Sequence, residues 1–176
     1  MKTDEERLYD DIMSNHTTLG IHISDHGDDM AVGEQMIGRY WKPRFLIDHR
    51  NRTAVEFISL NETLQTVSHD DIMWETLASA SKAALSRAED LSFHFPSFIY
   101  GYKNGVAKVQ WQINPDGMYY MDDDGFGMTP DEEYNIYGFI DRRGRVLSKF
   151  RHLSRHELDE KLDEMRREAQ SKVPVS

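Results

Sequence analysis

The sequence predicts a mixed α+β fold, in which an antiparallel β-meander carries a central helix on one face and helices at both termini. Three observations predict it. Short segments alternate apolar and polar residues, turn pairs such as Asn-Gly and Asp-Gly separate several of them, and longer segments repeat apolar residues at helical spacing. The length of 176 residues is typical of one domain, so we expect a single α+β domain over residues 1–176.

The helices have recognisable start signals. Thr3 and Glu6 have the spacing of a capping box, and so do Ser154 and Glu157. Between them lies a long segment with apolar residues at helical intervals and many small side chains that would let a sheet approach closely. The helices are therefore expected over residues 4–15, 68–90 (the central helix) and 154–171.

The strands are expected within residues 17–60 and 97–151, where aromatic and β-branched residues gather. Asn104-Gly105 is a strong hairpin signal, because both residues tolerate the positive φ of a tight turn. Residues 30–38 are ambiguous between a loop and a short helix, since Gly33 and Gly38 weaken a helix. The strands themselves are expected near residues 19–23, 39–47, 53–60, 97–102, 106–113, 118–121, 134–141 and 145–150.

The same periodicity predicts which side chains form the core. In the strand after Asn104-Gly105, apolar residues at every second position indicate one buried face. The expected core residues are Ile21, Phe57, Leu77, Ala84, Val109, Trp111, Ile140 and Phe150.

Two predicted hairpins resemble each other. Residues 46–60 align without gaps with residues 139–153, and both contain an Asp followed by a basic turn. An internal duplication and convergence on the same turn chemistry both explain this match. The shared pairs are Ile47 with Ile140, Asp48 with Asp141, Arg50 with Arg143, Arg52 with Arg145, Phe57 with Phe150 and Leu60 with Leu153.

The second of these hairpins has a family resemblance. YGFIDRRGRV (residues 137–146) resembles the aromatic-Gly-Phe-Ile-Asp-x-x-Gly hairpin of WG-type (KWG) β repeats, and YKNGVAKV (residues 102–109) is similar to the strand before it. The chain departs from the family pattern in that Tyr137 replaces the usual Trp, residues 110–136 intervene, and no tandem array follows. The resemblance implies β-hairpin architecture and an interaction role, with no catalytic residues to carry over.

Composition narrows the function classes. The absence of cysteine removes disulfides, thiolate zinc sites and cysteine nucleophiles. The net charge of −10 disfavours nucleic acid as a partner. We find no secretory signal and no apolar run long enough for a membrane span, so we expect a cytoplasmic protein with no membrane partner. The missing nucleophile-elbow, P-loop and dinucleotide motifs favour a non-enzymatic protein without a cofactor.

The leading functional hypothesis rests on residues 116–133, here called the acidic segment, which contains seven acids and no Lys or Arg. Aromatic side chains beside charge of one sign are typical of interaction surfaces. We expect a basic protein partner, as for small acidic inhibitors or immunity-type proteins. Alternatively, the rings point inward and the acids only solubilise the loop. The expected binding residues are Asp116, Tyr119, Asp122, Asp123, Asp124, Phe126, Asp131, Glu132 and Glu133.

That hypothesis depends on where the basic turns lie. Arg50, Arg52, Arg143 and Arg145 are the nearest candidates to neutralise the acidic segment. If these turns fold against it, the charges cancel and the surface is structural. If they lie apart, the negative field is open to a basic partner.

The alternative hypothesis is a metal-dependent hydrolase using Asp25 and His26, with His22 nearby. Residues 23–27 resemble the Asp-His-Gly metal motif of the alkaline phosphatase superfamily, in which an Asp and a His bind catalytic metal. That family needs a far larger domain and further ligands, so we predict no tight metal site here. Residues 122–125 resemble the middle of a calcium loop, but Tyr120 at the first ligand position breaks the EF-hand pattern. His152 and His156 are expected to be charge partners rather than metal ligands.

Overall fold

The computed structural model describes residues 1–37, 40–57, 96, 98–112, 120–121, 127–128, 135–153 and 157–173. The predicted α+β class is confirmed, since helices and antiparallel sheets are both present. In chain order, the elements are α1 (Asp4–Leu19), β1 (Ile21–Asp25), β2 (Met30–Ile37), β3 (Tyr40–Asp48), β4 (Thr53–Glu56), β5 (Phe98–Ile99), β6 (Ala107–Gln112), β7 (Tyr120–Met121), β8 (Gly127–Met128), β9 (Asn135–Ile140), β10 (Val146–His152) and α4 (Leu158–Ser171).

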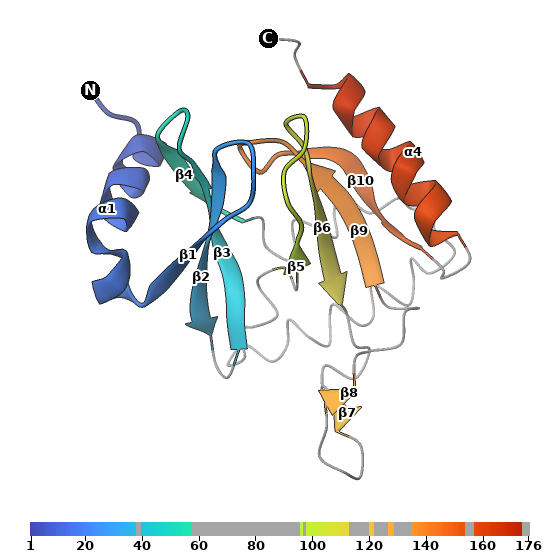
Figure 1. Ribbon diagram of the computed structural model, residues 1–176, viewed down its shortest axis with the longest axis horizontal. Helices are drawn as coiled ribbons and strands as arrows, with labels where there is room; N and C mark the ends of the chain where they lie inside the picture. The colour runs from blue at the N-terminus through green and yellow to red at the C-terminus, as the bar shows by residue number, and fades with distance from the viewer. Residues whose placement is uncertain are drawn as a thin grey trace.

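The strands form two four-stranded sheets, not one meander (Figure 1). The first sheet has the order β1-β2-β3-β4 and the second has the order β5-β6-β9-β10, while β7 and β8 pair with each other. Every pairing among these strands is antiparallel, as predicted. The prediction of a single meander was wrong because alternation shows which face of a strand is buried, but not which strand lies beside it.

Helix α1 starts as predicted and ends later. The Thr3 hydroxyl accepts a hydrogen bond from the Glu6 N–H, and the Glu6 carboxylate accepts one from the Thr3 N–H, both at 3.2 Å. The helix continues to Leu19 and ends at Gly20, whose φ of 71° is left-handed and whose N–H bonds to the last turn. The predicted end at residue 15 and strand start near Leu19 were wrong, because Gly20 is the stop signal.

The interpretation of residues 30–38 as a loop or short helix was also wrong. Strand β2 lies between β1 and β3 and pairs with both along most of its length. A Cβ on Gly33 would lie 3.1 Å from the Ile21 side chain and 3.3 Å from that of Phe45. This glycine therefore allows a close cross-strand approach beside a register shift and does not mark a helix end.

The β5–β6 hairpin turns at Asn104 and Gly105, as predicted. Both residues have positive φ, 53° and 81°, which their small or absent side chains tolerate. Lys103 and Val106 form a bridge across the turn, and Phe98 pairs with Gln110 further along.

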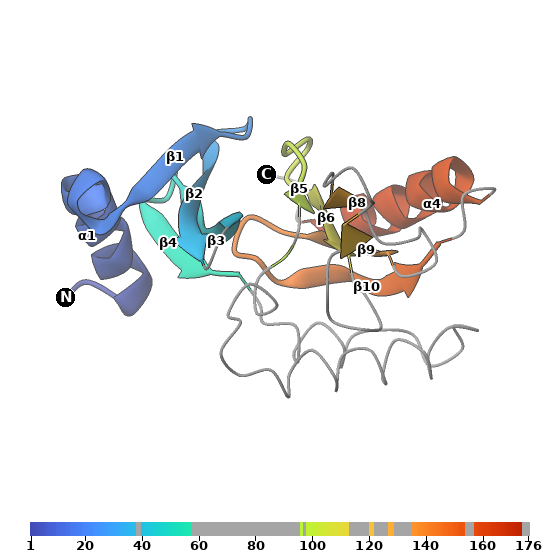
Figure 2. The same cartoon turned by 90° about the horizontal axis from the view of Figure 1, so that it is seen from below.

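One hydrophobic cluster draws on both sheets. It joins Met30, Val32, Leu46 and Phe57, which belong to or follow the first sheet, to side chains of the second. Figure 2 shows the two sheets side by side, with α1 on the outer side of the first and α4 against the second. Of the predicted core residues, Leu77 and Ala84 lie outside the described residues, and the buried ones are Ile21, Phe57, Val109, Trp111, Ile140 and Phe150.

Helix α4 packs on the second sheet through Leu162, Met165 and Ala169. Its described part begins at Leu158, and the Glu157 side chain makes no capping hydrogen bond, so the predicted start at residue 154 was wrong. Ser154 of the expected capping box lies outside the described residues, as does the predicted central helix over residues 68–90. Within the described ranges, neither helix carries an apolar stretch long enough to cross a bilayer.

The two echoed hairpins occupy matching places. β3–β4 and β9–β10 are the third and fourth strands of their sheets in chain order. Their turns differ in length, because Ile47 pairs with Ala54 whereas Ile140 pairs with Val146. The turn of the first hairpin is thus one residue longer, but a register shift after Val146 restores the match: Leu46 pairs with Val55, and the aligned Phe139 pairs with Ser148.

Candidate functional site

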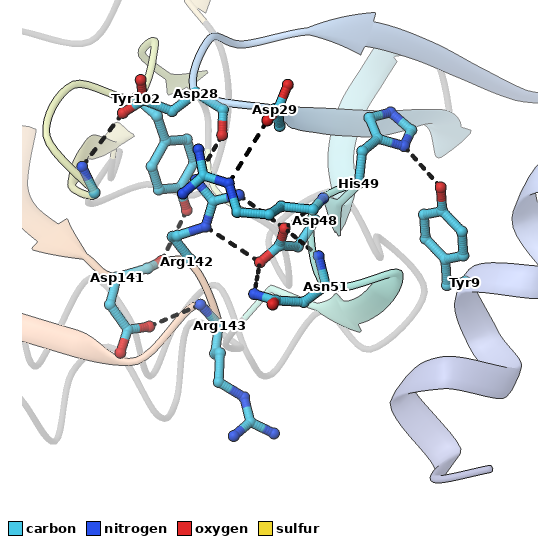
Figure 3. A network of polar contacts seen from close by, with 12 residues as sticks. Tyr9, Asp28, Asp29, Asp48, His49, Asn51, Tyr102, Asp141, Arg142 and Arg143 are labelled. Carbon is cyan, nitrogen blue, oxygen red and sulfur yellow. Dashed lines mark hydrogen bonds and ion pairs between the residues drawn. The ribbon is translucent and has the colours of Figure 1, made fainter. Parts of the chain in front are cut away.

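Asp48 and Arg142 link the two sheets in the polar network of Figure 3. Asp48 ends β3, and Arg142 lies in the turn between β9 and β10. Arg142 Nε donates to Asp48 Oδ2 at 3.2 Å, and Arg142 Nη2 donates to Asp48 Oδ1 at 2.8 Å. The third nitrogen, Nη1, donates to the backbone carbonyl of Asp28 at 2.5 Å. The planar guanidinium thereby holds a side chain of one sheet and a backbone group of the β1–β2 turn at once.

Asp48 has no capacity left for substrate. Besides the two bonds from Arg142, it accepts bonds from the N–H groups of Arg50 at 3.0 Å and Asn51 at 3.1 Å, and from Asn51 Nδ2 at 2.8 Å. Burial raises the pKa of this carboxyl, but the hydrogen bonds from Arg142 and Asn51 outweigh burial and bring the pKa below its ordinary 3.8. The carboxylate is charged at neutral pH, and its oxygens are already occupied by hydrogen bonds. These properties suit a structural ion pair and not a general base.

Asp141 occupies the matching position in the second hairpin. Its Oδ1 accepts bonds from the N–H groups of Arg143 and Arg145, both at 2.9 Å, and its Oδ2 accepts one from Arg145 Nε at 2.9 Å. The Asp141 carbonyl accepts the Tyr102 hydroxyl at 2.8 Å. Burial raises the pKa of Tyr102 well above its usual range, so this phenol stays a hydrogen-bond donor.

A cavity of about 450 Å³ lies beside the β1–β2 turn and is lined by three acids and His49. The acids have partners: Asp25 Oδ1 accepts the Gly27 N–H at 3.1 Å, Asp28 Oδ2 accepts the Gly105 N–H at 3.3 Å, and Asp29 pairs with an arginine. His49 Nδ1 lies 2.9 Å from the hydroxyl of Tyr9 in α1. These contacts shape the turn and tie it to its neighbours.

The three residues of the hydrolase hypothesis take separate roles. The His22 ring lies edge-on to Trp41, with centroids 6.5 Å apart, while Asp25 caps the turn. His26 Nε2 is buried and has no hydrogen-bond partner among the residues that the structure describes. Burial lowers the pKa of this ring more than the nearby Asp25 and Glu34 raise it, so it is neutral at pH 7. In the part of the chain that the structure describes, no group of three His, Asp or Glu side chains could hold a metal ion.

The predicted binding residues of the acidic segment, from Asp116 to Glu133, lie outside the described residues. The structure does describe the strands on either side of the segment in the sequence. Gln112 of β6 pairs with Asn135 of β9. It also describes β7 and β8, which pair within the segment and project beyond the end of the second sheet in Figure 1.

The four arginines of the basic turns have partners elsewhere in the protein. Arg50 Nε lies 3.6 Å from Asp29, Arg143 Nη2 lies 2.5 Å from Glu5 of α1, and Arg145 Nε lies 2.9 Å from Asp141. The Arg52 guanidinium lies over the ring of Tyr9, 5.8 Å from its centroid. None of these partners belongs to the acidic segment.

Sequence reasoning missed two features. It identified Asp48 and Asp141 as matching turn residues but gave Arg142 no role. Arg142 pairs with the Asp of the other hairpin, Asp48, and not with its neighbour Asp141. It also missed a basic cleft at Lys108 and Arg166, whose residues come from distant segments that no local pattern connects.

The chain was also compared with known proteins. No family model, no curated protein and no solved structure matches it. A function for this chain therefore has to rest on its own residues and geometry.

Proposed function

We propose that the chain is a non-enzymatic binding module of the cytoplasm, whose acidic segment receives a basic protein partner, as small acidic inhibitors and immunity-type proteins do. Residues 116–133 have a net charge of −7, in a protein whose net charge is −10. Aromatic residues between them supply anchors, while the charge steers a cationic partner toward them.

The observation that carries the proposal concerns the four arginines of the basic turns, which are the candidates to neutralise the acidic segment. All four interact with residues outside that segment. Asp29, Glu5 and Asp141 compensate three of them, and the Tyr9 ring holds the fourth. Because these partners lie outside the acidic segment, the basic turns do not need the segment's carboxylates to balance their charge. This favours a negative field that is open to a partner.

The strands before and after the acidic segment in the sequence support the same proposal. These strands, β6 and β9, are hydrogen-bonded to each other inside the second sheet. Val109 and Trp111 of β6 and Ile136 of β9 are buried, so the two strands are anchored in the core. Binding residues are commonly carried on loops that a rigid sheet positions in this way. We also propose that the chain is related to WG-type β repeats and that a central helix lies across one sheet face.

The test is a charge reversal, Asp122→Lys with Asp123→Lys and Asp124→Lys, measured against a lysine-rich peptide by fluorescence anisotropy. A matched control reverses three exposed acids elsewhere, Asp11, Glu157 and Glu160, which have no ion pair among the described residues. Both variants change the net charge equally, so they separate local recognition from overall attraction.

The proposal expects the segment variant to fold like the wild type and to lose at least about tenfold in affinity, while the control loses much less. Equal losses in both variants would show that only overall charge matters. Loss of folding in the segment variant, with no peptide binding by the wild type, would show that the acids form an internal network instead.

A further inference from the structure

The structure holds a second concave site, away from the acidic segment. A cleft of about 280 Å³ opens between the β5–β6 hairpin, β9 and α4. Its wall carries three cations and two aromatic rings, in a protein whose net charge is −10. The residues that matter are Tyr100, Lys103, Val106, Lys108, Phe139 and Arg166.

Lys108 of β6 lines this cleft. It faces Phe139 across the β6–β9 pair, and its Nζ lies 3.9 Å from the centroid of the Tyr100 ring. No carboxylate or other acceptor in the described part of the chain bonds to this ammonium group, and the side chain is half-buried. Burial lowers the pKa of Lys108, and the nearby Arg166 lowers it further. An ammonium in this position has lost water without gaining an anion.

The other charges around the cleft leave an excess of positive charge. Arg166 of α4 lies over the Phe139 ring, 5.6 Å from its centroid, and pairs with Asp163 at 3.2 Å. Asp159 raises the pKa of Lys108 by its charge but forms no ion pair with it. Lys103 is exposed on the turn and has no ion pair within the described ranges. Of the three cations, only Arg166 therefore forms an ion pair with a described carboxylate.

We propose that this cleft binds a small aromatic acid, with its carboxylate or phosphate at Lys108 and its ring against Tyr100 and Val106. An oxyanion would give the Lys108 ammonium the anionic partner that no described residue supplies, and Arg166 and Lys103 would add to the attraction. The cleft is slightly smaller than most ligand pockets, whose volumes are roughly 300–1,000 Å³, so a ligand with one ring fits it best.

The test is an NMR titration of the amide signals of the full chain with phenyl phosphate and, separately, with benzoate. Inorganic phosphate provides the anion without a ring, and benzyl alcohol provides a ring without a charge. The proposal expects saturable shifts around Tyr100, Lys108 and Arg166 with at least one aromatic acid, and weaker effects from both partial ligands. The tighter of the two acids identifies the preferred anion.

Two variants make the result decisive. Lys108→Met removes the charge and keeps the length of the side chain, and it should weaken binding at least about tenfold without lowering the melting temperature. Lys149→Met on β10, an exposed position with no described ion pair, should bind like the wild type. The inference is overturned if neither acid binds up to about 10 mM, a value that corresponds to only about 3 kcal/mol of binding free energy, or if Lys108→Met binds as well as Lys149→Met.

Discussion

The guanidinium of Arg142 donates two hydrogen bonds to the carboxylate of Asp48, at 2.8 and 3.2 Å, although the two residues are 94 positions apart in the sequence. Asp48 ends a strand of the first sheet, and Arg142 lies in a turn of the second, so the pair connects the two sheets at one edge of their shared core. Their side chains are 2% and 17% exposed. Removing either partner leaves the other buried without its counter-charge.

Arg142→Met should therefore lower the free energy of unfolding strongly. Breaking a buried ion pair from one side costs about 3 kcal/mol, because an unpaired charge stays behind. Urea unfolding followed by circular dichroism measures the change. Arg151→Met, at an exposed position on β10, is the control and should shift stability by less than about 0.5 kcal/mol. A similar loss of unfolding free energy in both variants would show that the Asp48–Arg142 ion pair does not stabilise the contact between the two sheets.

Stability should also depend on pH through Asp48. The pKa of this carboxyl is lower in the folded state than its ordinary 3.8, so its contribution is fully present above 3.8 and is lost as pH falls through the folded value. Asp48→Asn removes this contribution at every pH. The stability difference between wild type and Asp48→Asn, measured from about pH 6 to pH 3, should shrink at the acidic end. A constant difference over that range would contradict the assignment.

Gly138→Ala should destabilise the second sheet. A Cβ at this position would lie 2.8 Å from three atoms of the Phe150 ring, and Phe150 is completely buried. Overpacking of this kind costs about 2 kcal/mol. Gly101→Ala is the control, since the one described atom that its Cβ would meet is the His26 carbonyl oxygen, at an ordinary contact distance of 3.5 Å. Thermal unfolding compares the two, and equal melting temperatures would show that the ring yields easily.

Local sequence signals predicted local structure well. Thr3 and Glu6 form the capping box that starts α1, and Asn104 and Gly105 form the turn with positive φ that their residue types indicate. Alternation along β6 correctly placed Val109 and Trp111 in the core. Each of these features depends on neighbours within a few residues, which is why one sequence suffices to find them.

Features that depend on distant residues could not be predicted in the same way. Gly33 indicated a break in a helix, but its role is to let Ile21 and Phe45 approach, and those residues lie on other strands. The division into two sheets, the Asp48–Arg142 pair and the cleft at Lys108 likewise depend on which segments become neighbours in space. The residues of the acidic segment, from Asp116 to Glu133, remain a prediction from composition.

The salt dependence of association tests the proposed function most directly. Stopped-flow measurement of a lysine-rich peptide binding to the wild-type chain should show a rate that falls steeply as ionic strength rises past about 0.1 M, where the screening length is about 10 Å. The variant with Lys at positions 122, 123 and 124 should show a slow rate with little salt dependence. A wild-type rate that stays constant from about 0.02 M to about 0.5 M salt, or the same salt dependence in wild type and variant, would contradict recognition through the acidic segment.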